Sequence, residues 1–314
     1  MSWKAGIILF AFASLAGALE PIRVSHSAYY VRGETGLPSA ANRGFTSNAG
    51  FVITSEGVVV FDTLGTPALG EALLAAVRKL TDRPIRRVVV SHYHADHFYG
   101  LPAVKAAGAE IWAHRAAERY LAGEAPKARL AERSQTLARW VKPDMPLVGA
   151  DRWLDRTEVF RLGWLTFRVF PVGPAHTPED LAMLVEEEGA LFVGDLMFAG
   201  RVPFVGEADS KAWIEAIDKV VAFSPRVMIG GHGDASRNAA ADLRLTREYL
   251  VYLRQTMGAA ASELIDFETA YARTDWSRFA HLPAFEAANR RNAWNTYVRM
   301  QGEPFDTGGN HGNR

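Results

Sequence analysis

Short apolar runs alternate with amphipathic segments through most of the chain. Residues 22–62 have a β pattern, in which Gly50–Ile53 and Val58–Phe61 flank a Ser-Glu-Gly turn and predict a hairpin. Residues 66–80 predict a helix with Thr66 as its N-cap and proline at its first position. A β-branched run, Ile85–Val90, follows and is typical of a buried strand. This order predicts a right-handed βαβ unit.

The second half repeats this layout and ends in helices. The pattern predicts one hairpin from Val159–Leu162 and Leu165–Val169 and a second from Leu181–Val185 and Ala190–Val193. It also predicts a helix at Ser210–Phe223 and a strand at Arg226–Ile229. Because each half contributes hairpins, a helix and a polar loop at a strand end, we expect one α/β domain over residues 19–235. Helical patterns at 238–257 and 284–300 predict a C-terminal helical extension, residues 236–314, packed on that domain.

A polar loop at residues 91–100 follows the buried strand. It places His92, His94, Asp96 and His97 within six positions. Ligands of open α/β folds bind at the carboxyl ends of strands. Imidazole and carboxylate groups are the zinc ligands when no thiolate is present, and the chain has no cysteine. A loop this tight aims His92 and His94 at one point and Asp96 and His97 at another, which suits two adjacent ions.

The H-x-H-x-D-H motif resembles that of the metallo-β-lactamase fold hydrolases. In that family a lone His, an Asp and a last His follow at strand ends, and here His176, Asp195 and His232 occur in that order. The resemblance implies an α/β fold, the αβ/βα four-layer sandwich. Ala175–Asp180, Gly200–Phe204 and the tail segments 274–276 and 289–294 further resemble a periplasmic branch associated with sulfur oxidation and quinoprotein relay systems.

The resemblance also implies a ligand set. One zinc would take His92, His94 and His176, the other would take Asp96, His97 and His232, and Asp195 would bridge them. A bridging hydroxide would then attack an ester, thioester or amide-like carbonyl. Class B β-lactamases commonly have Cys or a small residue at the bridging position, whereas glyoxalase II and lactonases have Asp. We therefore expect a glyoxalase II-like site with at most weak β-lactamase activity. Iron and manganese stay open, because ligand types do not fix the metal.

Other side chains have two interpretations each. Asp96 is either a ligand or the proton acceptor for the attacking water. Tyr93 is either a donor to a developing oxyanion or a packed aromatic. Arg201 is either a clamp for a substrate carboxylate or sulfur oxyanion, or a structural ion-pair residue. Asp62 either orients a metal-binding His or belongs to a turn, and His114 has the position of a structural histidine.

The charge balance and the N-terminal residues bear on the partners and the cellular location of the protein. The 35 basic and 35 acidic residues balance, which argues against nucleic acid or an anionic membrane as a partner and favours a small-molecule substrate. Residues 1–18 combine Lys4, an apolar run at 5–15 and a small-residue Ala-Gly-Ala site, which predicts a signal peptide cleaved near Ala18. The apolar run is shorter than the ~20 residues of a membrane span. We expect a periplasmic protein with no membrane attachment after cleavage.

Two rival functions fit the same motifs. One is a non-hydrolytic accessory protein of a periplasmic sulfur-oxidation or quinoprotein relay system, docking a redox-protein partner through the C-terminal helices. The other is an iron-dependent persulfide dioxygenase with a mononuclear site. The joint presence of Asp96, His97 and His232 favours two ions.

Overall fold

The structure, a computed structural model, describes residues 19–302. The predicted signal peptide at 1–18 and the end of the predicted extension lie outside the described residues. Within the described part of the chain, no helix combines the length and apolar character needed to cross a membrane.

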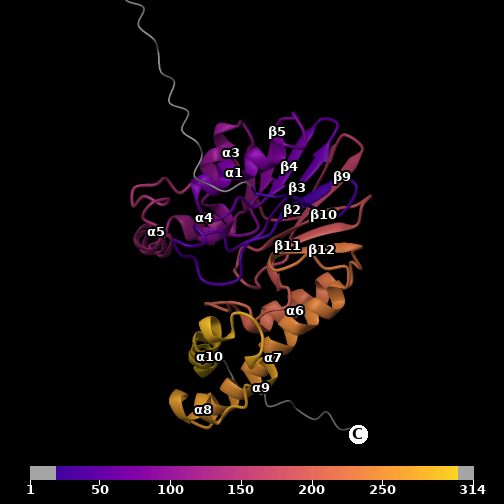
Figure 1. Ribbon diagram of the computed structural model, residues 1–314. Coiled ribbons are helices and arrows are strands. Elements are labelled where there is room, and N and C mark those ends of the chain that lie inside the picture. Colours follow the sequence, from indigo (N-terminus) through magenta and orange to yellow (C-terminus); the bar gives the residue numbers. More distant parts are fainter. Residues whose placement is uncertain (1–18, 303–314) are drawn as a thin grey trace, which may run out of the picture.

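Two β-sheets face each other, and helices cover their outer faces (Figure 1). The first sheet holds, in chain order, β1 (Ile22–Arg23), β2 (Ala28–Val31), β3 (Ala49–Thr54), β4 (Gly57–Phe61), β5 (Ile85–Val89), β6 (Glu110–His114) and β7 (Arg152–Leu154). The second has the order β12 (Val227–His232), β11 (Ala190–Phe198), β10 (Leu181–Val185), β9 (Leu165–Pro171) and β8 (Glu158–Leu162). This arrangement confirms the predicted four-layer α/β sandwich.

The helices divide between the two halves. The first half supplies α1 (Pro67–Arg78), α2 (Ala95–Phe98), α3 (Leu101–Ala106), α4 (Ala116–Leu121) and α5 (Ala125–Thr136). The second half supplies α6 (Ser210–Val221), α7 (Ala239–Ser262), α8 (Phe267–Arg273), α9 (Ser277–Ala280) and α10 (Phe285–Gln301). In Figure 1 the helices α7 to α10 lie together below the sandwich, on the side of α6.

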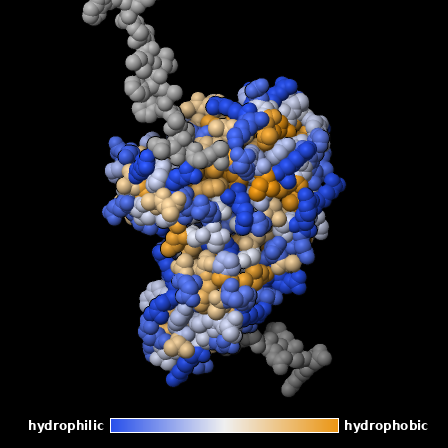
Figure 2. Space-filling model, in the orientation of Figure 1, coloured by the Kyte–Doolittle hydropathy of each residue, from blue (hydrophilic) through white to orange (hydrophobic). Residues whose placement is uncertain are grey.

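Apolar residues fill the layers between these elements. The inward faces of the two sheets meet through fully buried side chains such as Phe61 and Val89 from the first sheet and Phe167 and Phe192 from the second. A second cluster joins the first sheet to α1 and α3, and a third joins β11 and β12 to α6, α7 and α10. Because the third cluster is continuous, the helical extension shares a core with the second sheet. Hydrophilic residues cover much of the face shown in Figure 2.

The local predictions for the first half are confirmed. β3 and β4 pair antiparallel across the predicted turn, and β4 and β5 pair parallel on either side of α1. Thr66 caps α1, since its Oγ1 accepts a hydrogen bond from the Leu69 backbone N–H at 3.2 Å. The βαβ unit therefore delivers the end of β5 to the middle of the sheet edge, where the polar loop begins.

One predicted strand end is wrong and concerns a site residue. The strand expected to end before Asp195 continues through it to Phe198, so Asp195 lies inside β11 rather than in a loop after it. The physical reason is a break in the β11–β12 register on either side of Gly194, whose φ of 52° bends the strand without ending it.

Candidate metal centre

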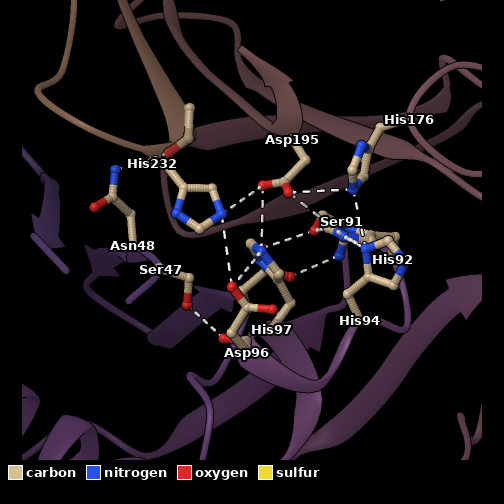
Figure 3. Close-up of polar contacts among 12 residues, drawn as sticks. Ser47, Asn48, Ser91, His92, His94, Asp96, His97, His176, Asp195 and His232 are labelled. Carbon is tan, nitrogen blue, oxygen red and sulfur yellow. Dashed lines mark hydrogen bonds and ion pairs between the residues drawn. The ribbon is translucent and has the colours of Figure 1, made fainter. Parts of the chain in front are cut away.

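Seven His and Asp side chains converge between the two sheets (Figure 3). They come from the loop and short helix after β5, from the loop before β10, from β11 and from the end of β12: His92, His94, Asp96, His97, His176, Asp195 and His232. They form two sets, His92, His94, His176 and Asp195, and Asp96, His97 and His232, and in each set one ligand atom per residue lies within 4.8 Å of the others. The structure thus brings together every ligand predicted from the sequence.

Three imidazoles make up most of the first set. His94 Nδ1 lies 3.0 Å from His92 Nε2 and 2.9 Å from His176 Nε2. Burial lowers the pKa of His94 to about 3 and that of His176 to about 4. Because these imidazoles are neutral at ordinary pH, their convergent lone pairs are available to a cation.

Asp195 faces both sets with different oxygen atoms. Its Oδ2 lies 3.3 Å from His176 Nε2 and 3.9 Å from His92 Nε2, on the side of the first set. Its Oδ1 lies 3.2 Å from His97 Nε2 and 3.3 Å from His232 Nε2, on the side of the second. Burial alone would raise the pKa of this carboxyl, but the surrounding histidines hold it well below its usual value. The carboxylate is therefore charged and has the geometry of a bridge.

The donor set fits divalent metal ions. In the second set Asp96 Oδ2 lies 3.6 Å from His232 Nε2 and 3.8 Å from His97 Nε2. His97 Nε2 and Asp195 Oδ1 are buried and have no hydrogen-bond partner among the described residues. Buried polar atoms without partners are rare in folded proteins, and imidazole with carboxylate is the donor chemistry of zinc and related ions. The cluster is accordingly a His/Asp metal-binding site.

Asp62 orients the loop after β5. The buried carboxylate accepts hydrogen bonds from the Ser91 backbone N–H at 2.7 Å and from Ser91 Oγ at 2.8 Å. Its Oδ2 also lies 2.9 Å from His97 Nδ1, which turns His97 Nε2 toward Asp195. Ser91 Oγ in turn lies 2.9 Å from His92 Nδ1. Of the two interpretations of Asp62, the structure supports the one in which it orients metal-binding histidines.

A polar segment at residues 46–48, which sequence reasoning missed, joins the two halves of the site. The Thr46 carbonyl lies 2.8 Å from His232 Nδ1, and Ser47 Oγ donates to the Asp96 carbonyl. Asn48 Nδ2 donates to the Gly230 carbonyl at 2.9 Å, beside the end of β12. The sequence signal for this segment is only a short polar run before a predicted strand.

Two aromatic rings and a glycine contact the ligands that come from the second half of the chain. The Phe198 ring stacks on His232 with centroids 4.8 Å apart, and Trp213 from α6 packs edge-on to His176 at 5.0 Å. A Cβ at position 231 would lie 2.0 Å from Asp195 Oδ1, so a glycine is required there. The absence of a side chain at this position lets the backbone before His232 approach Asp195 closely.

The structure decides between the two interpretations of Tyr93. Tyr93 is fully buried and packs against Phe98 with ring centroids 4.7 Å apart, and its hydroxyl makes no hydrogen bond within the described part of the chain. Burial, and then the nearby Asp151 and Glu179, raise its pKa well above the usual value of a tyrosine. The structure supports the packed-aromatic interpretation of Tyr93 and does not bring its hydroxyl to the cluster.

His114 lies at the start of α4, whereas Arg201 lies close to the cluster. His114 Nδ1 accepts a hydrogen bond from the Ala116 backbone N–H at 3.2 Å, which gives it the expected structural role at the start of α4. Arg201 is buried just beyond β11, and its electrostatic neighbours are Asp195 and Asp96. It therefore belongs to the surroundings of the cluster.

A sandwich of two sheets between helices, with a His/Asp cluster where the two sheets meet, defines a metal-binding protein of the αββα fold class. The sequence profile of the metallo-beta-lactamase superfamily matches residues 42–232, more than half of the 314 residues, and the chain belongs to that superfamily.

Known relatives include several hydrolases. The chain is 26% identical over 255 residues to a linear primary-alkylsulfatase from Pseudomonas sp. (strain ATCC 19151), covering 67% of this chain and 48% of the relative. It is 26% identical over 134 residues to the hydroxyacylglutathione hydrolase GloC of Haemophilus influenzae, covering 42% of this chain and 58% of that one. The fold is similar to that of the sec-alkylsulfatase Pisa1 from Pseudomonas sp., with a TM-score of 0.64, 19% identity, and coverage of 94% of this chain and 52% of that one. The chain thus spans about half the length of these alkylsulfatases.

Proposed function

We propose that this protein is an exported hydrolase that holds two zinc ions and cleaves an ester, thioester or amide-like carbonyl compound. The observation that carries the proposal is the position of Asp195. One of its oxygens lies within 3.3 Å of His176 Nε2 and the other within 3.3 Å of His97 and His232 Nε2, so a single carboxylate serves both ligand sets. A shared anion of this kind lowers the repulsion between two adjacent dications.

The residues of the chain then have separate tasks. When bound, the two ions would acidify a water molecule and polarise the bond to be broken. His92, His94 and His176 would hold one ion, and Asp96, His97 and His232 the other. The Asp96 side chain is 22% exposed against 5% for Asp195, so Asp96 is the carboxylate of the cluster that can also pass a proton to solvent.

Two features support a carbonyl ester or thioester as the substrate. The bridging residue is Asp195 and the chain has no cysteine, which is the glyoxalase II-like pattern rather than that of class B β-lactamases. The relatives include hydroxyacylglutathione hydrolases from two bacteria. Weak β-lactamase activity is the most that we expect.

Metal content is the first test. Elemental mass spectrometry of the purified protein should give close to two zinc ions per chain, and Asp195→Ala should lose metal because neither set keeps its shared anion. Asp218→Ala, which removes an exposed carboxylate paired with Arg247, is the matched control and should keep both ions. The metal-loaded protein should hydrolyse members of a panel of thioesters, lactones and β-lactams.

Other results would favour the rival functions. One iron per chain would overturn the two-zinc mechanism and direct attention to persulfide oxidation. Two bound ions with no turnover of any panel member would support an accessory role beside a periplasmic redox protein.

Export is a separate part of the proposal. It is supported by the charge, apolar run and small residues within 1–18. Recovery of the protein from the periplasm with an N-terminus near residue 19 would support it, and a cytoplasmic protein that keeps Met1 would contradict it.

A further inference from the structure

A buried cation that pairs with no described carboxylate lies beside the metal centre. Arg201 is 2% exposed, and its Nε and Nη2 atoms are buried with no hydrogen-bond partner among residues 19–302. A guanidinium group carries a permanent charge and five N–H donors, and burying it unpaired is costly. Such a group is stable only if the structure or a ligand supplies a compensating anion.

The position of Arg201 directs it toward the cluster. It follows β11 by three residues, and its Cζ lies 5.8 Å from the centre of the Phe198 ring. That same ring stacks on His232. The carboxylates that interact electrostatically with Arg201 are Asp195 and Asp96, both members of the cluster. The guanidinium is therefore a neighbour of the reaction site and not part of a surface ion pair.

These two carboxylates do not neutralise Arg201 once metal is bound. Two dications already use the negative charges of Asp62, Asp96 and Asp195 and of a bridging hydroxide, so the positive charge of Arg201 is left unmatched. A bound anion would compensate it. Arginine is the side chain best suited to such a group, because its planar fork binds the oxygens of a carboxylate, sulfonate or sulfate in pairs.

We propose that Arg201 is the receptor for an anionic oxygen group of the substrate, located next to the bond that is hydrolysed. This inference rests on the proposed hydrolase function and narrows its substrates to anionic esters or thioesters. Arg201 contacts the substrate without taking part in bond making, so its contribution is to bind and orient.

The C-terminal helices hold the segment that carries Arg201. The Val202 backbone N–H donates to the Pro283 carbonyl at 3.0 Å, just before α10. Asn292 of α10 is buried, accepts a hydrogen bond from the Val205 backbone N–H at 2.9 Å and donates to the Pro203 carbonyl at 2.6 Å. Its side chain thus fixes both sides of the turn that follows Arg201. Asn292 is a positioning residue for the anion receptor, which gives the helical extension a role in substrate selection.

Anion binding tests this proposal without relying on turnover. Inorganic sulfate is titrated calorimetrically at low ionic strength into the metal-loaded full chain, with the metal content of every sample measured beforehand. Arg201→Gln should raise the sulfate Kd by about 10-fold to 100-fold, the usual effect of losing a charge-assisted hydrogen-bond pair. Arg201→Lys keeps the charge and should show a smaller increase. Arg247→Gln removes an exposed arginine paired with Asp218 and should bind sulfate as the parent does.

Kinetics separate the receptor from a structural residue. With a matched pair of thioesters, one carrying a carboxylate and one neutral, Arg201→Gln should lower kcat/KM for the anionic member by a clearly larger factor than for the neutral member. Asn292→Ala should raise KM for the anionic member with kcat retained, by a smaller factor.

Failure of the two proposals would look different. Equal sulfate affinity of the parent and Arg201→Gln, at equal metal content, would overturn the anion receptor whatever the turnover. An equal decrease of kcat/KM for both thioesters in Arg201→Gln would also overturn it. A fully metal-loaded parent that binds sulfate through Arg201 but hydrolyses neither thioester would contradict the hydrolase function alone.

Discussion

The two halves of the metal centre are built differently. The loop after β5 contributes His92, His94, Asp96 and His97 within six residues and is held from behind by polar contacts. The second sheet contributes one ligand from each of three separate segments. Aromatic rings pack against two of them, Trp213 against His176 and Phe198 against His232, and His232 also has a polar contact with the Thr46 carbonyl.

This difference separates two physical functions. Hydrogen bonds to a ligating imidazole set its tautomer and raise its basicity, so they act mainly on metal affinity. Aromatic packing buries apolar surface and acts mainly on the stability of the fold. Substitutions that remove the hydrogen bonds should therefore raise the metal Kd, and substitutions that remove the aromatic packing should lower the free energy of unfolding.

The largest effect should come from Trp213, the fully buried ring beneath His176. Trp213→Ala should lower the free energy of unfolding of the metal-free protein by about 3–5 kcal/mol, because it leaves a cavity and removes the hydrogen bond from Nε1 to the Leu196 carbonyl. Denaturant titration in the presence of a chelator measures this loss. Trp164→Ala, at a half-exposed position, is the control and should change stability by no more than about 0.5 kcal/mol. A Trp213→Ala protein that is as stable as the parent would contradict the view that aromatic packing in this half stabilises the fold.

The next effect should come from Asp62 and should appear in metal affinity. Asp62→Asn keeps the size of the side chain but replaces one of its two acceptor oxygens by an amide donor. Since the Ser91 backbone N–H and His97 Nδ1 use different oxygens, one of the two loses its acceptor. Zinc affinity, measured by competition with a chromophoric chelator, should fall by about 10-fold to 100-fold. Asp218→Asn on the surface should leave it unchanged. If Asp62→Asn weakened the fold and left the zinc Kd as it was, Asp62 would be a structural residue of its turn.

The same contrast explains what the sequence could predict. The four ligands after β5 are adjacent in sequence, so their convergence follows from local geometry. Asp62 had two open interpretations, and its position directly after the neighbouring strand β4 made a supporting role possible without deciding it. The individual hairpins and helices were predictable because their periodicity is local, whereas the four-layer sandwich was implied by the resemblance to the metallo-β-lactamase fold hydrolases.

Features that depend on contacts between distant segments were not predictable from periodicity. Asp195 lies inside β11 because a register break, set by pairing with β12, lets the strand continue. The contact of Thr46 with His232 joins residues that are 186 positions apart, and that of Asn292 with Pro203 spans 89. The burial of Tyr93 away from the cluster likewise depends on packing against Phe98 and Trp153. Neither hydrophobic pattern nor motif spacing carries such information.

The smallest effect should come from Ser91, which connects Asp62 to His92. Ser91→Ala removes a hydroxyl 2.8 Å from Asp62 Oδ2 and 2.9 Å from His92 Nδ1, but it keeps the backbone N–H that donates to Asp62. Losing one hydrogen bond of this kind costs about 1 kcal/mol, so zinc affinity should fall by about fivefold, less than in Asp62→Asn. Because the hydroxyl acts through Asp62, the double variant should bind zinc only slightly less tightly than Asp62→Asn alone. Effects that add to within about 0.5 kcal/mol would instead show that Ser91 and Asp62 act on the two histidines independently.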